Sequence, residues 1–274
     1  MIFDTHTHYD DRRFDEDRGM LLDSLSEKGV AGIAAIGADL ESSEASLALA
    51  KEYPFILAAV GVHPDRVSEL EEEKEQGTER LRRLMKDPRC AAVGEIGLDY
   101  HGDFPGKPSR FVQQYWFSFQ LEMAKKEELP IVIHSRDAAA DTLSLIREAG
   151  GSSLSMVHHC FGYEKETAKL YLDMGHFLGI GGVVTYKNGR KLKEVVQYMP
   201  LDRILLETDC PYLPPEPFRG RRNDSTLLSY VVSEIARLKQ ISEEEVETIT
   251  CENAMRFYRL AEREKNEFFA VRGR

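Results

Sequence analysis

Short apolar runs alternate with longer amphipathic segments along the whole chain. The runs do not alternate with polar residues, as a strand with one solvent-exposed face would. Continuous apolar runs are typical of strands buried on both faces of a parallel sheet. The pattern predicts eight strands, at Ile2–His6, Val30–Ala38, Phe55–His63, Cys90–Leu98, Pro130–Ser135, Leu154–His159, Phe177–Val184 and Arg203–Asp209.

The segments between these runs have the spacing of helices. We predict helices at Asp15–Lys28, Ser42–Lys51, Ser109–Lys126 and Thr226–Leu238, and a last one from Ser242 onward. Within the third of these, Phe111, Tyr115, Phe119 and Met123 recur at every fourth position. Residues four apart share one helix face, so we expect this stripe to face the core.

Eight strands separated by helices predict an α/β fold, a TIM-type (β/α)8 barrel that forms a single domain over residues 1–274. An open doubly wound sheet is the alternative. That fold usually has a G-x-G-x-x-G turn after its first strand, whereas this chain has His6-Thr7-His8 there. The barrel is therefore favoured.

The charge balance argues against a broad nucleic-acid-binding face. Lys and Arg number 36 against 47 Asp and Glu, a net charge of -11, whereas proteins that coat nucleic acid are usually basic. A polyanionic substrate would have to be attracted locally, by metal ions or by a small basic cluster.

The remaining composition favours a cytoplasmic protein. The four cysteines contain no C-x-x-C pair, which indicates reduced thiols rather than a disulfide framework. The start of the chain lacks a basic segment followed by an apolar core, and no apolar run approaches the ~20 residues that span a bilayer. We expect no membrane association and no obligate protein partner.

The positions of the histidines indicate a site. Of eight histidines, six lie at or just beyond the carboxyl end of a predicted strand, and in a barrel these ends meet at one mouth. His6 and His8 are two residues apart, so both imidazoles point to the same side of a strand and can reach one cation.

Acidic residues occur where apolar side chains are expected. Glu95 interrupts the apolar strand that contains Gly94 and Gly97, and Asp209 ends another such strand. A lone buried carboxylate costs several kcal/mol unless it is paired or binds a metal. The two glycines leave room for another group to approach Glu95 closely.

We therefore predict a metal site of nitrogen and oxygen ligands, made by His6, His8, Glu95, His134, His159 and Asp209. Such ligands suit zinc, manganese, iron or nickel, or magnesium with additional water. Six ligands exceed the need of one tetrahedral catalytic ion, so two divalent metal ions bridged by a carboxylate are the simpler interpretation.

Short motifs around the candidate ligands occur over nearly the whole chain. They are Phe3-Asp4-Thr5-His6-Thr7-His8, Gly61-Val62-His63-Pro64, Gly94-Glu95-Ile96-Gly97-Leu98-Asp99-Tyr100, Ile133-His134-Ser135-Arg136, His159-Cys160-Phe161, Glu207-Thr208-Asp209-Cys210-Pro211-Tyr212-Leu213, Arg219-Gly220 with Asn223, and Asn253-Ala254. In these motifs and in their order the sequence resembles the TatD family of metal-dependent deoxyribonucleases, within the amidohydrolase-like barrels.

The resemblance implies a TIM-type barrel that hydrolyses phosphodiester bonds of DNA, commonly as a 3′-to-5′ exonuclease acting on single strands or ends. It implies that His6, His8, Glu95 and Asp209 hold one metal and that Glu95 bridges to a second, held by His134 and His159. It places His63 beside the substrate phosphate. In one departure, the family usually has a small residue and then Gly after the His159-Cys160-Phe161 motif, whereas this chain has Gly162-Tyr163-Glu164.

The expected catalytic residues are Asp209, Glu95 and His63, with Asp209 receiving the proton of the attacking water. Arg219 and Arg222 lie in a proline-rich segment after Asp209, and we expect at least one of them to bind DNA phosphates. Pairing with surface carboxylates is the alternative for these arginines. The alternative functions are a metal-dependent hydrolase of another ester, amide or phosphoester, and a metal-binding scaffold without turnover.

Overall fold

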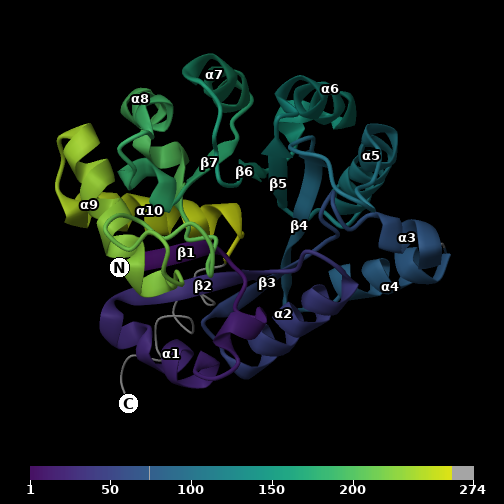
Figure 1. Ribbon diagram of the computed structural model, residues 1–274, viewed down its shortest axis with the longest axis horizontal. Coiled ribbons are helices and arrows are strands. Elements are labelled where there is room, and N and C mark those ends of the chain that lie inside the picture. The colour runs from purple at the N-terminus through teal and green to yellow at the C-terminus, as the bar shows by residue number, and fades with distance from the viewer. Residues whose placement is uncertain (74, 261–274) are drawn as a thin grey trace.

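The computed structural model describes residues 1–73 and 75–260. Eight parallel strands form one sheet in which each strand pairs with the next along the chain, from β1 to β8. A parallel bridge between Thr7 and Cys210 joins the first strand to the segment after the last, and Figure 1 shows the helices surrounding the strands. The predicted (β/α)8 barrel is confirmed, and a sheet with two open edges is not observed among the described residues.

All eight predicted strands are present, several of them shorter than predicted at the carboxyl end. Their bounds are β1 Ile2–Thr7, β2 Val30–Ile36, β3 Ile56–Val60, β4 Cys90–Asp99, β5 Ile131–Arg136, β6 Met156–His158, β7 Phe177–Ile180 and β8 Ile204–Leu206. The apolar run that contains β7 continues as a 3-10 helix rather than as strand. The chain thus leaves the sheet early and builds the mouth of the barrel from loops.

Helices follow the strands as expected. The α-helices are α1 Arg18–Ser24, α2 Leu40–Glu52, α3 Ser68–Glu73, α4 Glu75–Met85, α5 Arg110–Lys126, α6 Ala139–Ala149, α7 Lys165–Asp173, α8 Arg190–Tyr198, α9 Leu228–Lys239 and α10 Glu243–Phe257. Short 3-10 helices are η1 Arg12–Phe14, η2 Ser26–Lys28, η3 Gly151–Ser153, η4 Gly182–Thr185, η5 Leu201–Arg203 and η6 Ser225–Leu227.

The prediction that the aromatic stripe of α5 faces the core is wrong for its first half. Phe111 is 78% exposed and Tyr115 54% exposed. The buried face of the helix instead contains Phe117, Leu121 and Ala124, each 0% exposed. A helix can bury only one stripe of its surface, and this neighbouring row occupies that stripe.

The core lies on both faces of the sheet. Ile33 belongs to one buried apolar cluster and Ala34 to another, and successive residues of a strand point to opposite faces. The second cluster also contains Val132 and Val157. His134 and His159 follow these valines by two residues, so they continue the inner face of the barrel toward its mouth.

A buried carboxylate joins the first and last strands near the closure of the barrel. Asp4, 0% exposed, accepts hydrogen bonds from the Thr208 backbone at 2.9 Å, from the Thr208 hydroxyl at 2.7 Å and from Ser225 Oγ at 2.7 Å. Burial raises the pKa of Asp4 to about 7, although these hydrogen bonds oppose the shift.

Within residues 1–73 and 75–260, no helix is both long and apolar enough to span a bilayer.

Candidate metal centre

The first strand places two imidazoles side by side at the mouth. The Nε2 atoms of His6 and His8 are 3.2 Å apart. The Nδ1–H of His8 donates to the Ile36 carbonyl at 2.9 Å, so the Nε2 lone pair of the neutral ring faces the centre. Asp209 Oδ1 lies 3.7 Å from His6 Nε2 and 3.4 Å from His8 Nε2. These three side chains form one group of converging ligand atoms.

Glu95 lies in the middle of the cluster and is 5% exposed. Its Oε1 is 2.6 Å from His134 Nδ1 and 2.8 Å from His159 Nε2. Its Oε2 is 3.5 Å from His6 Nε2. Glu95 is the common member of two further ligand groups, one with His6 and His159 and the other with His63 and His134.

The electrostatics of the cluster favour positive charge. Burial alone would raise the pKa of Glu95, but His159, His63 and His134 hold it well below its usual range. Burial alone would lower the pKa of His159, but Glu95 and Glu207 raise it well above its usual value. Ionised carboxylates therefore dominate the potential at this point.

Two glycines allow β4 to lie close against β5 at the site. A Cβ on Gly94 would lie 2.6 Å from Val132 Cβ, and one on Gly97 would lie 1.9 Å from the His134 carbonyl oxygen. Neither contact is possible for a real side chain, so these positions require glycine. The prediction that Gly94 and Gly97 permit a close approach beside Glu95 is confirmed.

Two outer carboxylates face the far side of the histidine rings. His134 Nε2 lies 2.9 Å from Asp99 Oδ2, and His159 Nδ1 lies 3.6 Å from Glu207 Oε1. Asp99 and Glu207 are 4% and 1% exposed. Because Asp99 accepts the Nε2 proton, the Nδ1 of His134 is the nitrogen presented to Glu95 and the centre.

His63 differs from the other central histidines in its tautomer. The Asp65 backbone N–H donates to His63 Nδ1 at 3.1 Å, so the neutral ring carries its proton on Nε2, which lies 3.7 Å from Glu95 Oε1. Burial lowers the pKa of His63 to about 3 and thereby keeps the ring neutral. In this tautomer the ring directs an N–H donor toward Glu95.

The side chains present fit divalent metal ions. Imidazole nitrogens and carboxylate oxygens converge within 4.8 Å in each ligand group, and buried carboxylates supply compensating negative charge. The Nδ1 of His6 and that of His159 are buried without a hydrogen-bond partner among the described residues. This donor set, which contains no thiolate, suits zinc, manganese, iron, nickel or magnesium.

Arg219 and Arg222, the two arginines expected to bind DNA phosphates, lie outside this cluster. Arg222 donates to both carboxylate oxygens of Asp17, at 2.7 and 2.6 Å. The Arg219 guanidinium lies over the Tyr186 ring at 4.4 Å from its centroid. A DNA phosphate would have to compete with Asp17 for Arg222, so a role in DNA binding stays a prediction.

Two further histidines form a buried pair on the outer face of the barrel. His158 Nε2 lies 3.1 Å from His176 Nδ1, and the His158 ring stacks on Tyr171 with centroids 3.6 Å apart. His158 therefore faces away from the site, opposite to its neighbour His159.

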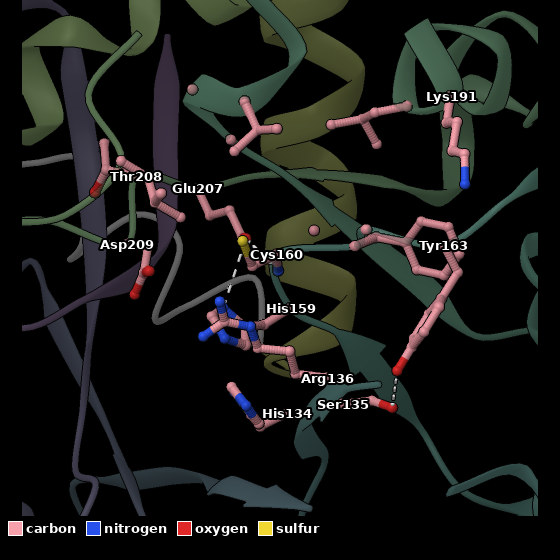
Figure 2. A pocket seen from close by; sticks show the side chains of 18 of the residues that line it. His134, Ser135, Arg136, His159, Cys160, Tyr163, Lys191, Glu207, Thr208 and Asp209 are labelled. Atoms are coloured by element: carbon pink, nitrogen blue, oxygen red, sulfur yellow. Dashed lines mark hydrogen bonds and ion pairs between the residues drawn. The ribbon is translucent and has the colours of Figure 1, made fainter. Parts of the chain in front are cut away.

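Sequence reasoning assigned no role to Asp99, Glu207 or Arg136. Asp99 and Glu207 each sit at the end of an apolar run, the same signal that identified Glu95 and Asp209. Arg136 follows His134 by two residues, so it projects from the same face of β5. Figure 2 shows Arg136 and Glu207 beside one cavity, together with His134, His159 and Asp209.

Comparison with known proteins gives one consistent family. A sequence model described as TatD-related DNase matches residues 3–259. The chain is 38% identical to the uncharacterized metal-dependent hydrolase YabD of Bacillus subtilis, over 95% of this chain and 100% of the relative. It is 32% identical to a protein named 3′-5′ ssDNA/RNA exonuclease TatD from Erwinia tasmaniensis, over 94% of this chain and 100% of the relative.

The fold agrees with that of a solved relative. The crystal structure of YjjV, a TatD homologue from Escherichia coli, superposes with a TM-score of 0.86 at 29% identity, covering 95% of this chain and 98% of that one.

Proposed function

The chain belongs to the family of TatD-related deoxyribonucleases and is a metal-dependent hydrolase, and from this premise we propose that it is a 3′-to-5′ exonuclease with a two-metal site that cleaves phosphodiester bonds of single-stranded DNA. The observation that carries the proposal is the placement of Glu95. It lies between the group His6–His8–Asp209 on one side and the imidazoles of His134 and His159 on the other.

In this proposal His6, His8 and Asp209 would hold one divalent ion, His134 and His159 would hold a second, and Glu95 is placed to serve both. When bound, a pair of divalent ions supplies charge neutralisation at a phosphodiester and activation of water. The 2.6 and 2.8 Å contacts of Glu95 to His134 and His159 support its shared role.

Asp209 and His63 have the positions required for work on the substrate. The Asp209 side chain is 17% exposed, more than that of Glu95 at 6%, so its carboxylate is reachable from the mouth. We assign it the proton of the attacking water. His63, neutral with its proton on Nε2, would donate a hydrogen bond to a non-bridging phosphate oxygen, which is where negative charge is held during displacement.

The net charge of -11 limits how nucleic acid can bind. A strand would be held at the mouth by local contacts, since a surface of this overall sign repels the phosphate backbone. This favours single strands and ends over extended duplex.

We also propose a cytoplasmic location, supported by the four free thiols.

The experiment is a degradation assay with the metal-free protein and defined divalent cations. Substrates are linear single-stranded DNA, circular single-stranded DNA, duplex DNA and single-stranded RNA; RNA is included because of the name of the Erwinia relative. The proposal predicts mononucleotides released progressively from the 3′ end of the linear strand. Cleavage of the circle at the same rate would contradict exonuclease action, and no cleavage of any strand would contradict the nuclease.

A further inference from the structure

A cavity of about 660 Å³ opens directly beside the cluster of histidine and carboxylate side chains. His134 and Asp209 line it on one side, and Tyr163 and Lys191 line it on the other, as Figure 2 shows. Its size lies within the range of roughly 300–1,000 Å³ that is usual for sites of small molecules. It has room for one nucleotide in a defined position and none for a base-paired duplex.

Arg136 supplies a solvent-exposed guanidinium to this cavity. It lines the cavity wall next to His134, and its side chain makes no hydrogen bond or ion pair to any residue that the structure describes. Arg222, in contrast, is engaged by Asp17. In a chain of net charge -11, a free guanidinium beside a cluster for metal ions is suited to phosphate oxygens, which it can bind in a fork.

Tyr163 supplies a fixed aromatic wall. Its hydroxyl lies 2.9 Å from Ser135 Oγ and accepts the Ala138 backbone N–H at 3.1 Å. Its ring also contacts Phe161 edge to face, with centroids 5.9 Å apart. Rings held in this way are the usual platforms for nucleobases, because every base has a π-face.

The side of the cavity away from Asp209 is bounded by two helices. Glu164, which precedes α7, forms an ion pair with Lys191 of α8, and both residues line the cavity. Both side chains are more than half exposed, Lys191 at 69% and Glu164 at 52%, so this ion pair forms part of the rim of the cavity.

We propose that this cavity holds the terminal nucleotide of a single strand, with Arg136 binding its phosphate and Tyr163 packing against its base. The inference rests on the proposed nuclease function and names the residues that select the substrate.

Calorimetric titration of the full-length, metal-loaded protein with deoxyadenosine 5′-monophosphate and with inorganic phosphate tests the proposal. Base stacking on a protein ring contributes ~1–3 kcal/mol, roughly 5- to 150-fold in affinity. We expect the nucleotide to bind at least about tenfold more tightly than phosphate. Tyr163→Ala should weaken nucleotide binding about tenfold and leave phosphate binding unchanged, whereas Tyr163→Phe, which keeps the ring, should stay within about twofold of wild type.

Arg136→Ala should weaken the binding of nucleotide and phosphate alike, by about tenfold. The matched control is Arg190→Ala, which removes a positive charge from a side chain 87% exposed on α8 and outside the cavity, and should change neither. Equal wild-type affinity for nucleotide and phosphate would overturn the proposal without any variant. So would equal nucleotide affinities of Tyr163→Ala and Tyr163→Phe, or of Arg136→Ala and Arg190→Ala.

The titration tests the cavity assignment and the degradation assay tests the nuclease, so either proposal can be refuted without the other. If the wild type degrades single strands but binds the nucleotide no better than phosphate, the cavity assignment is wrong and the nuclease stands. If it binds the nucleotide tightly but degrades no strand, the nuclease is wrong and the nucleotide cavity stands.

Discussion

The hydrogen bond between Asp99 and His134 fixes which nitrogen of that imidazole faces the proposed metals. Asp99 Oδ2 lies 2.9 Å from Nε2, while Nδ1 lies 2.6 Å from Glu95 Oε1. Burial would raise the pKa of Asp99, but His134 and Lys107 hold it at about 2, so the carboxylate is ionised. Asp99→Asn keeps the shape of this side chain and removes its charge.

We expect Asp99→Asn to weaken metal binding without removing a ligand. Loss of an outer partner of a ligating histidine commonly lowers metal affinity ~10–100-fold, which corresponds to roughly 1.4–2.7 kcal/mol. The Asp99–His134 contact is short and Asp99 is 4% exposed, so solvent cannot replace it. We therefore expect the upper part of this range for the ion held by His134, and little change for the ion held by His6 and His8.

Calorimetric titration of the metal-free protein with manganese measures both affinities. Asp137→Asn is the matched control, because Asp137 also pairs with a histidine, His101, at 2.7 Å but is 63% exposed and has no contact with the cluster. Its backbone φ of 53° is one that asparagine adopts readily. Unchanged affinities in Asp99→Asn, or an equal weakening in Asp137→Asn, would refute the reasoning.

Three further predictions concern other residues. Glu95→Gln should lower bound metal, counted by elemental analysis, while His63→Ala should not; equal decreases would show that the two roles are misassigned. Burial lowers the pKa of His176 from 6.5 to about 4. As the pH falls, the ring is therefore protonated at a higher pH in the unfolded chain than in the folded one. Folding stability should decrease as the pH drops from 6.5 to about 4. His176→Gln should retain up to about 3 kcal/mol more of its neutral-pH stability at pH 4 in denaturant titrations, and parallel pH profiles would contradict this. Replacing Arg219 and Arg222 with Ala should flatten the log–log salt dependence of single-strand binding by ~0.7 for each phosphate that is no longer neutralised, and an unchanged slope would leave both arginines structural.

Much of the fold is predictable from hydrophobic pattern, because strands buried on both faces of a barrel are apolar along their whole length. The ends of those strands are predicted less well. The run that begins at Phe177 stays apolar to Val184, yet β7 ends at Ile180 and the chain turns into η4. An apolar run predicts that its residues are buried, but residues at the mouth of the barrel can be buried without pairing in the sheet.

The α5 stripe shows a second limit of pattern. Phe111 and Tyr115 have the spacing of a core face, but Phe117 and Leu121 occupy the core instead. Both rows are apolar, and only the packing of neighbouring helices decides between them. Sequence spacing alone carries no information on that choice.

The histidine and carboxylate cluster is predictable because barrel topology brings all strand ends to one place. The pairings within it are not. That Asp99 fixes the tautomer of His134, or that Asp17 engages Arg222, depends on side chains from distant segments. That the Arg136 side chain has no hydrogen bond or ion pair among the described residues is likewise not encoded in its local sequence.

The central claim is that this cluster binds the divalent ions on which phosphodiester hydrolysis depends. One preparation should be stripped with a chelator, its metal content measured, and its activity on linear single-stranded DNA followed as manganese or magnesium is added back. We predict no hydrolysis by the metal-free protein and recovery as occupancy rises toward two ions per chain. Full hydrolysis by protein shown to be free of metal would contradict the claim.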